Sequence, residues 1–324
     1  MCETCGHDHG HPDGRAYDRS HGHDHGHEHG HGRGHSQLPA NAKAEDFRVV
    51  VTGKGGVGKT SLTALLALRL ARRGLRVLSL DADPQVNLPW ALGLPAEEAQ
   101  TLTPLSENWD YVEETTGARP GDGWGLFFRL NPKVDDVVDR YGTVTPDGVR
   151  LLVMGNTVQP AAGCLCPENA LLAAVVNSIG LREGEAILMD TQAGFEHFGR
   201  ALARGFRHAV VVADPTFNGV QAALHAARLA RQLDIGAVHL VVNGVRDDDA
   251  YRRALERIDD AGGFDFASSH RLPWDETLRR SEPLVAPALD EAADPALAAA
   301  VDGLLQSLVG DETRTRRGLA TCAF

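Results

Sequence analysis

A glycine-rich segment at residues 53–60, Gly-Lys-Gly-Gly-Val-Gly-Lys-Thr, constrains the fold of this chain more than any other feature. It follows the apolar run Phe47–Val51 and precedes an apolar, helix-like stretch. Glycines let backbone N–H groups curl around a phosphate, and the start of a helix adds a positive dipole. The pattern therefore predicts a P-loop, in which Lys59 reaches the β- and γ-phosphates of a nucleotide and Thr60 holds Mg²⁺. The predicted contacts are Gly53, Lys54, Gly55, Gly56, Val57, Gly58, Lys59, Thr60 and Ser61.

Segments of strand length alternate with helix-like segments from Phe47 onward. The strand-like runs are Phe47–Val51, Arg76–Leu80, Arg150–Met154, Ala186–Met189, His208–Val212 and Val238–Val242. The helix-like stretches are Leu62–Arg73, Asn169–Ile179, Gln221–Leu233 and Tyr251–Ala261. Continuous apolar strands separated by helices predict an α/β fold, a mostly parallel sheet flanked by helices on both faces. Because ligands of such sheets bind at the carboxyl ends of the strands, we expect the functional side chains to follow the strands directly.

Composition divides the 324 residues into a His-rich tail (1–45), a P-loop domain (46–310) and a polar, flexible C-terminal tail (311–324). The chain has no run of about 20 apolar residues, the length that a membrane-spanning helix needs. Its first residues lack the apolar centre of a signal peptide, so we expect a cytoplasmic protein with no membrane partner. The net charge of −12 disfavours non-specific binding to nucleic acid, which relies on basic surface.

Residues 1–45 contain ten of the fifteen histidines and almost no apolar residues. Such a segment cannot offset its own conformational entropy by burial, so we expect it to be disordered. Neutral imidazole binds Ni, Zn and Cu without a fold, and acidic residues between the histidines distinguish the segment from a purification tag. The predicted histidine ligands are His7, His9, His11, His21, His23, His25, His27, His29, His31 and His35.

The extra lysine of the P-loop, Lys54, makes the segment resemble the signature-lysine (deviant Walker A) ATPases. These include septum-positioning, chromosome-partitioning and nitrogenase iron proteins. In that superfamily the corresponding lysine reaches the nucleotide of a partner subunit. The resemblance therefore implies an ATP-hydrolysing homodimer, in which Lys54 acts together with Lys59.

Polar residues at the ends of the predicted strands fit the same superfamily. Asp81-Ala-Asp83-Pro84 resembles its first switch, which implies that Asp83 orients the attacking water while Asp81 supports Mg²⁺. Asp190, at the end of an apolar strand, resembles the Walker B ligand of Mg²⁺. Asn243 follows another strand, and with Pro273 it is the predicted contact to the base. The residues after Asn243 lack the aspartate that reads guanine, so ATP is favoured over GTP.

A second chemical motif is Gly163-Cys-Leu-Cys-Pro167, which leads into a predicted helix. Proline favours the first helical turn, so Cys166 is the predicted N-cap, and a helix N-terminus favours the thiolate form that binds metal. Buried structural cysteines are the alternative, but a polar turn is a poor core segment. Structural metal sites typically take four ligands, so Cys164 and Cys166 of two symmetric subunits are predicted to share one metal ion.

Five motifs in order resemble the CooC-type accessory ATPases that insert nickel into carbon monoxide dehydrogenase. They are the P-loop, Asp81–Pro84, Leu130–Asp136, Gly163–Leu172 and Ala193–His197. The resemblance implies Ni²⁺ or Zn²⁺ at Cys164 and Cys166, and carbon monoxide dehydrogenase as the client. The opening residues resemble instead the nickel-hydrogenase maturation GTPase, whose nickel site implies Cys2, Cys5 and His7 as ligands here.

Three other functions compete with this hypothesis. A partitioning or septum-positioning ATPase would leave the cysteines unexplained. An iron–sulfur scaffold ATPase fits a shared thiolate site, although the histidine tail is a poor cluster environment. Maturation of hydrogenase is favoured by the first residues and disfavoured by the rest of the chain.

Overall fold

The computed structural model describes residues 47–119, 129, 132–134, 136–155, 166–179, 185–193, 203, 205–290 and 295–321. Within these ranges, eight strands form one sheet in the order β3-β4-β2-β5-β1-β6-β7-β8. The strands are β1 (Arg48–Gly53), β2 (Arg76–Ala82), β3 (Thr143–Val144), β4 (Arg150–Val153), β5 (Glu185–Thr191), β6 (His208–Ala213), β7 (Ala237–Val245) and β8 (Ser268–Pro273). All neighbours pair in parallel except β3 and β4, so the predicted mostly parallel α/β sheet is confirmed.

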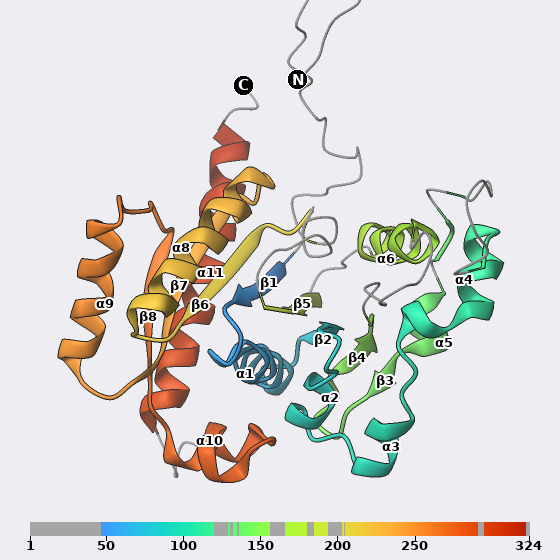
Figure 1. Ribbon diagram of the computed structural model, residues 1–324, viewed down its shortest axis with the longest axis horizontal. Coiled ribbons are helices and arrows are strands. Elements are labelled where there is room, and N and C mark those ends of the chain that lie inside the picture. Colours follow the sequence, from blue (N-terminus) through green and yellow to red (C-terminus); the bar gives the residue numbers. More distant parts are fainter. Residues whose placement is uncertain are drawn as a thin grey trace, which may run out of the picture. The chain divides into compact units, whose positions relative to one another are not determined.

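Helices cover both faces of this sheet (Figure 1). They are α1 (Lys59–Arg72), α2 (Leu88–Ala91), α3 (Ala96–Thr101), α4 (Trp109–Thr116), α5 (Val137–Tyr141), α6 (Cys166–Ser178), α8 (Phe217–Gln232), α9 (Asp248–Asp260), α10 (Glu276–Ser281) and α11 (Pro295–Thr321), with 3₁₀ turns η1 (Leu105–Glu107) and η2 (Ala286–Leu289). The four helices predicted from periodicity correspond to α1, α6, α8 and α9.

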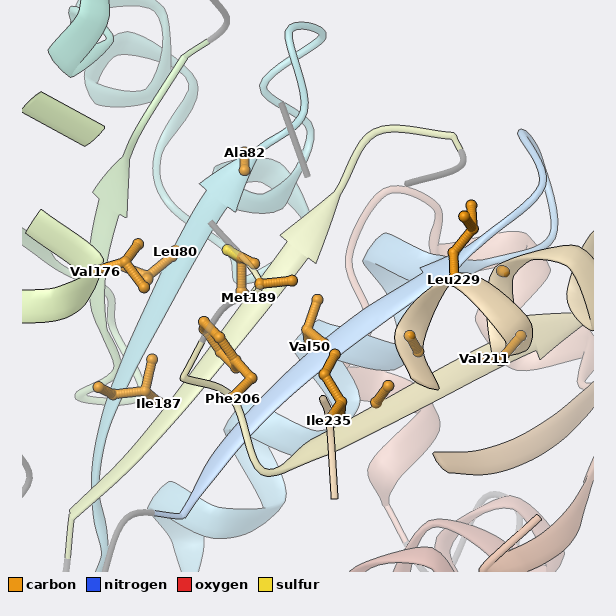
Figure 2. Close-up of a cluster of buried hydrophobic side chains, with 14 of the residues drawn as sticks. Val50, Leu80, Ala82, Val176, Ile187, Met189, Phe206, Val211, Leu229 and Ile235 are labelled. Atoms are coloured by element: carbon orange, nitrogen blue, oxygen red, sulfur yellow. The ribbon is translucent and has the colours of Figure 1, made fainter. Parts of the chain in front are cut away.

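Two apolar clusters explain why the central strands are continuously apolar. In β1, Val49 and Val51 belong to the cluster that includes α1 and α11, whereas Val50 belongs to the cluster that includes α6 and α8. Figure 2 shows part of the second cluster, with Val50 of β1 among Met189, Phe206 and Ile235. Because successive strand side chains point to opposite faces, a sheet covered twice needs apolar residues at every position.

Three parts of the fold differ from the prediction or extend it. Strand β8 has the polar sequence Ser-Ser-His-Arg-Leu-Pro and lies at the sheet edge, where one side needs no partner. The elements between β2 and β4 are short helices and the two-residue strand β3. Helix α11 continues to Thr321, past the predicted domain end at residue 310. Residues 311–321 contain no proline, the residue that most strongly interrupts a helix.

None of the helices described within the ranges above is both long and apolar enough to cross a membrane.

Candidate nucleotide-binding site

The P-loop joins the end of β1 to the start of α1, and two of its glycines lie too close to neighbours for any side chain. A Cβ on Gly53 would lie 2.2 Å from the carbonyl oxygen of Val212 in β6. Gly58 has φ +92°, and a Cβ there would lie 2.4 Å from Nδ2 of Asn243 in β7. Any larger residue would displace a neighbouring strand or side chain, so the path of the loop depends on glycine at both positions.

The first two residues of α1 point into the site. Lys59 is buried, and its Nζ donates to the carbonyl oxygen of Lys54 at 3.1 Å. Burial lowers the pKa of Lys59, while the carboxylates of Asp190 and Asp83 raise it. Thr60 Oγ1 donates to Oδ2 of Asp190 at 2.5 Å. The structure therefore brings the lysine predicted to bind phosphate together with Thr60 and Asp190, two of the three residues predicted to hold Mg²⁺.

Asp190 has the environment of a cation ligand. It is the penultimate residue of β5 and is fully buried. Burial raises its pKa to about 7, against the opposing effects of Thr60 and Lys59. Among the described residues, its Oδ1 has no hydrogen-bond partner. A buried carboxylate oxygen without a partner is costly. One carboxylate and one hydroxyl beside a phosphate loop fit Mg²⁺, which prefers oxygen ligands and would neutralise charge on the phosphates when bound.

Asp81 lies beside Asp190, because the two residues are register partners on β2 and β5. Its Oδ1 accepts the N–H of Asp83 and its Oδ2 accepts the N–H of Leu88, both at 3.0 Å. Burial, and then the charge of Asp190, raise the pKa of Asp81 well above its usual range. Asp81 thus anchors the loop between residues 83 and 88, and a contribution to Mg²⁺ binding stays a prediction.

The loop held by Asp81 carries Asp83, the predicted water-orienting residue. Oδ1 of Asp83 accepts the N–H of Gln85 at 2.9 Å, and its carbonyl oxygen accepts the N–H of Val86 at 3.0 Å. Val86 has φ +49°, which is rare for a β-branched residue and costs about 1–3 kcal/mol. The surroundings must therefore hold this turn in place, a feature that the sequence did not indicate.

The predicted base contacts lie at the adjoining ends of β7 and β8. Val242 pairs with Arg271 and Val245 with Pro273, so two residues of β7, Asn243 and Gly244, stand opposite one residue of β8. Bulges of this kind re-aim side chains next to binding sites. Here Asn243 Nδ2 donates to the carbonyl oxygen of Val57 in the P-loop at 2.8 Å. The end of β7 and the phosphate loop therefore form one hydrogen-bonded unit.

The predicted metal ligands fall mostly outside the described part of the chain. Cys166 is the first residue of α6, one position inside the helix rather than its N-cap, and its side chain is not described. Cys164 lies outside the described residues, as does the tail that contains Cys2, Cys5 and the histidines from His7 to His35. Within the described ranges, no group of three or more histidine, cysteine or acidic residues forms a metal site.

The family model of the CobQ/CobB/MinD/ParA nucleotide binding domain matches residues 48–283, which include the P-loop, Asp81, Asp190 and Asn243. The chain belongs to this family. Its members are P-loop ATPases that typically bind ATP or ADP together with Mg²⁺. The geometry above agrees with membership, since the loop, the lysine and the carboxylates meet at the carboxyl ends of the strands.

Two curated relatives match this ATPase over most of their length. The carbon monoxide dehydrogenase accessory protein CooC of Rhodospirillum rubrum is 36% identical over 235 residues, which cover 72% of this chain and 86% of that protein. An uncharacterized ATP-binding protein of Methanocaldococcus jannaschii is 35% identical over 235 residues, which cover 72% of this chain and 88% of that protein.

A solved structure shares the fold. The septum site-determining protein MinD from Pyrococcus horikoshii, complexed with Mg-ADP, aligns with a TM-score of 0.54 at 18% identity, covering 85% of this chain and 98% of that one. At this level of identity the likeness supports the fold alone.

Sequence reasoning missed the contacts that tie these residues to one another. The bond from Asn243 to Val57 joins residues 186 positions apart, and no local pattern indicates such a contact. The anchoring of Leu88 by Asp81 was equally hidden, although an aspartate followed by Asp-Pro is a common loop-organising pattern.

Proposed function

We propose that this chain is a cytoplasmic, homodimeric metallochaperone that binds nickel or zinc and uses ATP hydrolysis to drive nickel insertion into carbon monoxide dehydrogenase. The observation that carries the proposal is the 36% identity to the CooC accessory protein, over 86% of that protein's length. The matched family domain, residues 48–283, includes both the nucleotide site and the cysteine motif.

Cys164 and Cys166 are the proposed metal ligands. Cys166 opens the 13-residue helix α6, whose N-terminal dipole favours a thiolate. Two cysteines per chain supply four sulfurs only in a dimer, and closing the dimer on ATP would complete the site. Lys54, exposed at the surface of the P-loop, is the proposed contact to the partner's nucleotide. Hydrolysis, with Asp83 orienting the water, would open the dimer and release the metal.

The number of metal ions bound per chain, measured with and without nucleotide, tests whether the shared metal site depends on ATP. Chain lacking residues 1–45 would be loaded with Ni²⁺ or Zn²⁺, and bound metal measured by mass spectrometry without nucleotide, with ADP and with a non-hydrolysable ATP analogue. We expect one metal per two chains with the analogue, and loss of that metal in Cys164→Ser or Cys166→Ser. Cys322→Ser is the matched control. One metal per chain regardless of nucleotide would exclude the shared site.

The client requires a separate experiment. A strain that lacks the gene would be assayed for carbon monoxide dehydrogenase and for hydrogenase, with and without added nickel. Loss of the first activity, restored by nickel, is the expected result. Loss of hydrogenase alone would favour the second candidate, to which the Cys2, Cys5 and His7 pattern points. An iron–sulfur absorbance in protein purified without oxygen would favour a scaffold ATPase.

A further inference from the structure

The bulge at the end of β7 adjoins both the P-loop and a partly exposed tryptophan. Gly244, its second residue, has φ +70°, and a Cβ there would lie 3.7 Å from Cε3 of Trp274. The indole of Trp274 therefore packs on the backbone at Gly244. Asn243, the first residue of the bulge, holds the P-loop through its bond to Val57, so this surface begins one residue away from the phosphate loop.

Trp274 is held by groups on three sides, although 38% of it is exposed. Its backbone N–H donates to the carbonyl oxygen of Val245 at 3.0 Å, and its Nε1 donates to Oε1 of Glu276 at 2.8 Å. The guanidinium of Arg246 lies over the indole ring, 4.0 Å from its centroid. A large aromatic side chain fixed in this way beside a binding loop has been ordered before any ligand arrives.

We propose that Arg246 and Trp274 form the stacking wall of the base site, against which the purine ring of the bound nucleotide lies. Flat guanidinium and indole groups both bind aromatic bases through their faces. Asn243 is the predicted base contact, and the wall follows it on the same bulge, so the base would lie on the side of this pair. Arg246 and Trp274 thereby join Asn243 and Pro273 as specificity-determining residues.

The chain contains a second exposed tryptophan–arginine pair that serves as an internal comparison. Trp109 is 45% exposed, and the Arg119 guanidinium lies 5.7 Å from its ring centroid. This pair is on and beside α4, where the Arg119 guanidinium also lies near the carboxylates of Asp110 and Glu113 rather than near the P-loop or β7. Replacing Trp109 removes a similar area of exposed aromatic surface without affecting a wall beside the nucleotide.

Two probes separate the base from the phosphates. Titration calorimetry with Mg²⁺ would measure the affinity of the full chain for ATP and for inorganic tripolyphosphate, which has no base. We expect Trp274→Ala and Arg246→Gln each to weaken ATP binding about 10-fold, while tripolyphosphate binding stays within about 2-fold of wild type. Trp274→Phe, which keeps an aromatic face, should recover most of the ATP affinity. Trp109→Ala should change neither.

Three results would overturn the inference. Unchanged ATP affinity in both Trp274→Ala and Arg246→Gln would show that these two side chains do not contact the base. Equal weakening of ATP and tripolyphosphate in the folded variants would make the pair a support of the P-loop instead. Failure of Trp274→Phe to recover affinity would contradict stacking. Each readout concerns nucleotide binding alone, so none depends on whether the chain delivers a metal.

Discussion

A histidine pair buried in the sheet predicts how the stability of the fold depends on pH. His208 of β6 and His239 of β7 are almost wholly inaccessible, and His208 Nδ1 lies 3.2 Å from His239 Nε2. His239 Nδ1 in turn lies 2.7 Å from Oγ of Ser268, which lies 2.7 Å from Nε2 of the half-buried His270. Because a single proton lies between His208 Nδ1 and His239 Nε2, the two rings cannot both be charged.

Burial, reinforced by the charge of Arg207, lowers the pKa of His208 from 6.5 to about 4. Burial and the neighbouring His208 and His270 lower that of His239 to about 3. Below about pH 6.5 the unfolded chain therefore binds protons at these two histidines, whereas the folded chain binds them only at lower pH. The stability that the neutral His208 contributes is fully present above about pH 6.5 and is lost as pH falls toward about 4. For His208 alone, a pKa lowered from 6.5 to about 4 corresponds to about 3 kcal/mol of stability.

Urea unfolding between pH 7.5 and pH 4.5 measures this loss. We expect the wild-type chain to lose about 1.4 kcal/mol per pH unit for each buried histidine on the acid side of its unfolded pKa. His208→Asn keeps a polar group near the position of Nδ1 but does not titrate. Its free energy of unfolding should therefore fall less steeply with pH, by the contribution of one proton. The exposed His225 gives the control variant His225→Asn. Equal slopes in wild type and His208→Asn would refute the reasoning.

Four further predictions concern the nucleotide site and its supports. Asp190→Asn should weaken Mg-ATP binding and reduce hydrolysis at least 100-fold, measured by phosphate release, because Mg²⁺ would lose its buried carboxylate. Lys59→Ala should abolish hydrolysis in the same assay, and full turnover would contradict its assignment. Gly58→Ala should weaken nucleotide binding at least 10-fold, because its Cβ would meet Asn243 at 2.4 Å, whereas Gly74→Ala, with open space around it, should not. Asp302→Ala should cost about 1–2 kcal/mol in urea unfolding, since its two oxygens accept from Arg69 at 2.7 Å each.

Local patterns sufficed to predict the sheet and the phosphate loop. The central residues of the strands around Val50 and Val211 are apolar because both faces are covered, and a continuous apolar run is visible in a sequence. The loop was equally visible, since its chemistry lies in eight consecutive residues. Strand β8 was missed because Ser268 to Arg271 are polar residues at the sheet edge, so their sequence shows no apolar run or alternation.

The details of the site could not be predicted because they depend on contacts between distant segments. Asp81 was expected near Mg²⁺ from its position after a strand, but its oxygens accept two backbone N–H groups of the following loop. The strained turn at Val86 and the bulge at Gly244 depend on how the chain closes on itself. No composition rule places a valine at positive φ, and no spacing rule indicates a bulge at Gly244.

The two edges of the sheet limit how copies of this chain can associate. Strand β3 is only two residues long, and β8 presents Arg271, which is paired with Asp248, next to serine and histidine. Short strands and charged side chains are the features that prevent one sheet from adding its edge to another. Growth of a continuous intermolecular sheet, and the fibres to which it leads, is therefore disfavoured. These edges favour a proposed dimer built from loops and helices, whose contacts would form and break while both sheets stay intact.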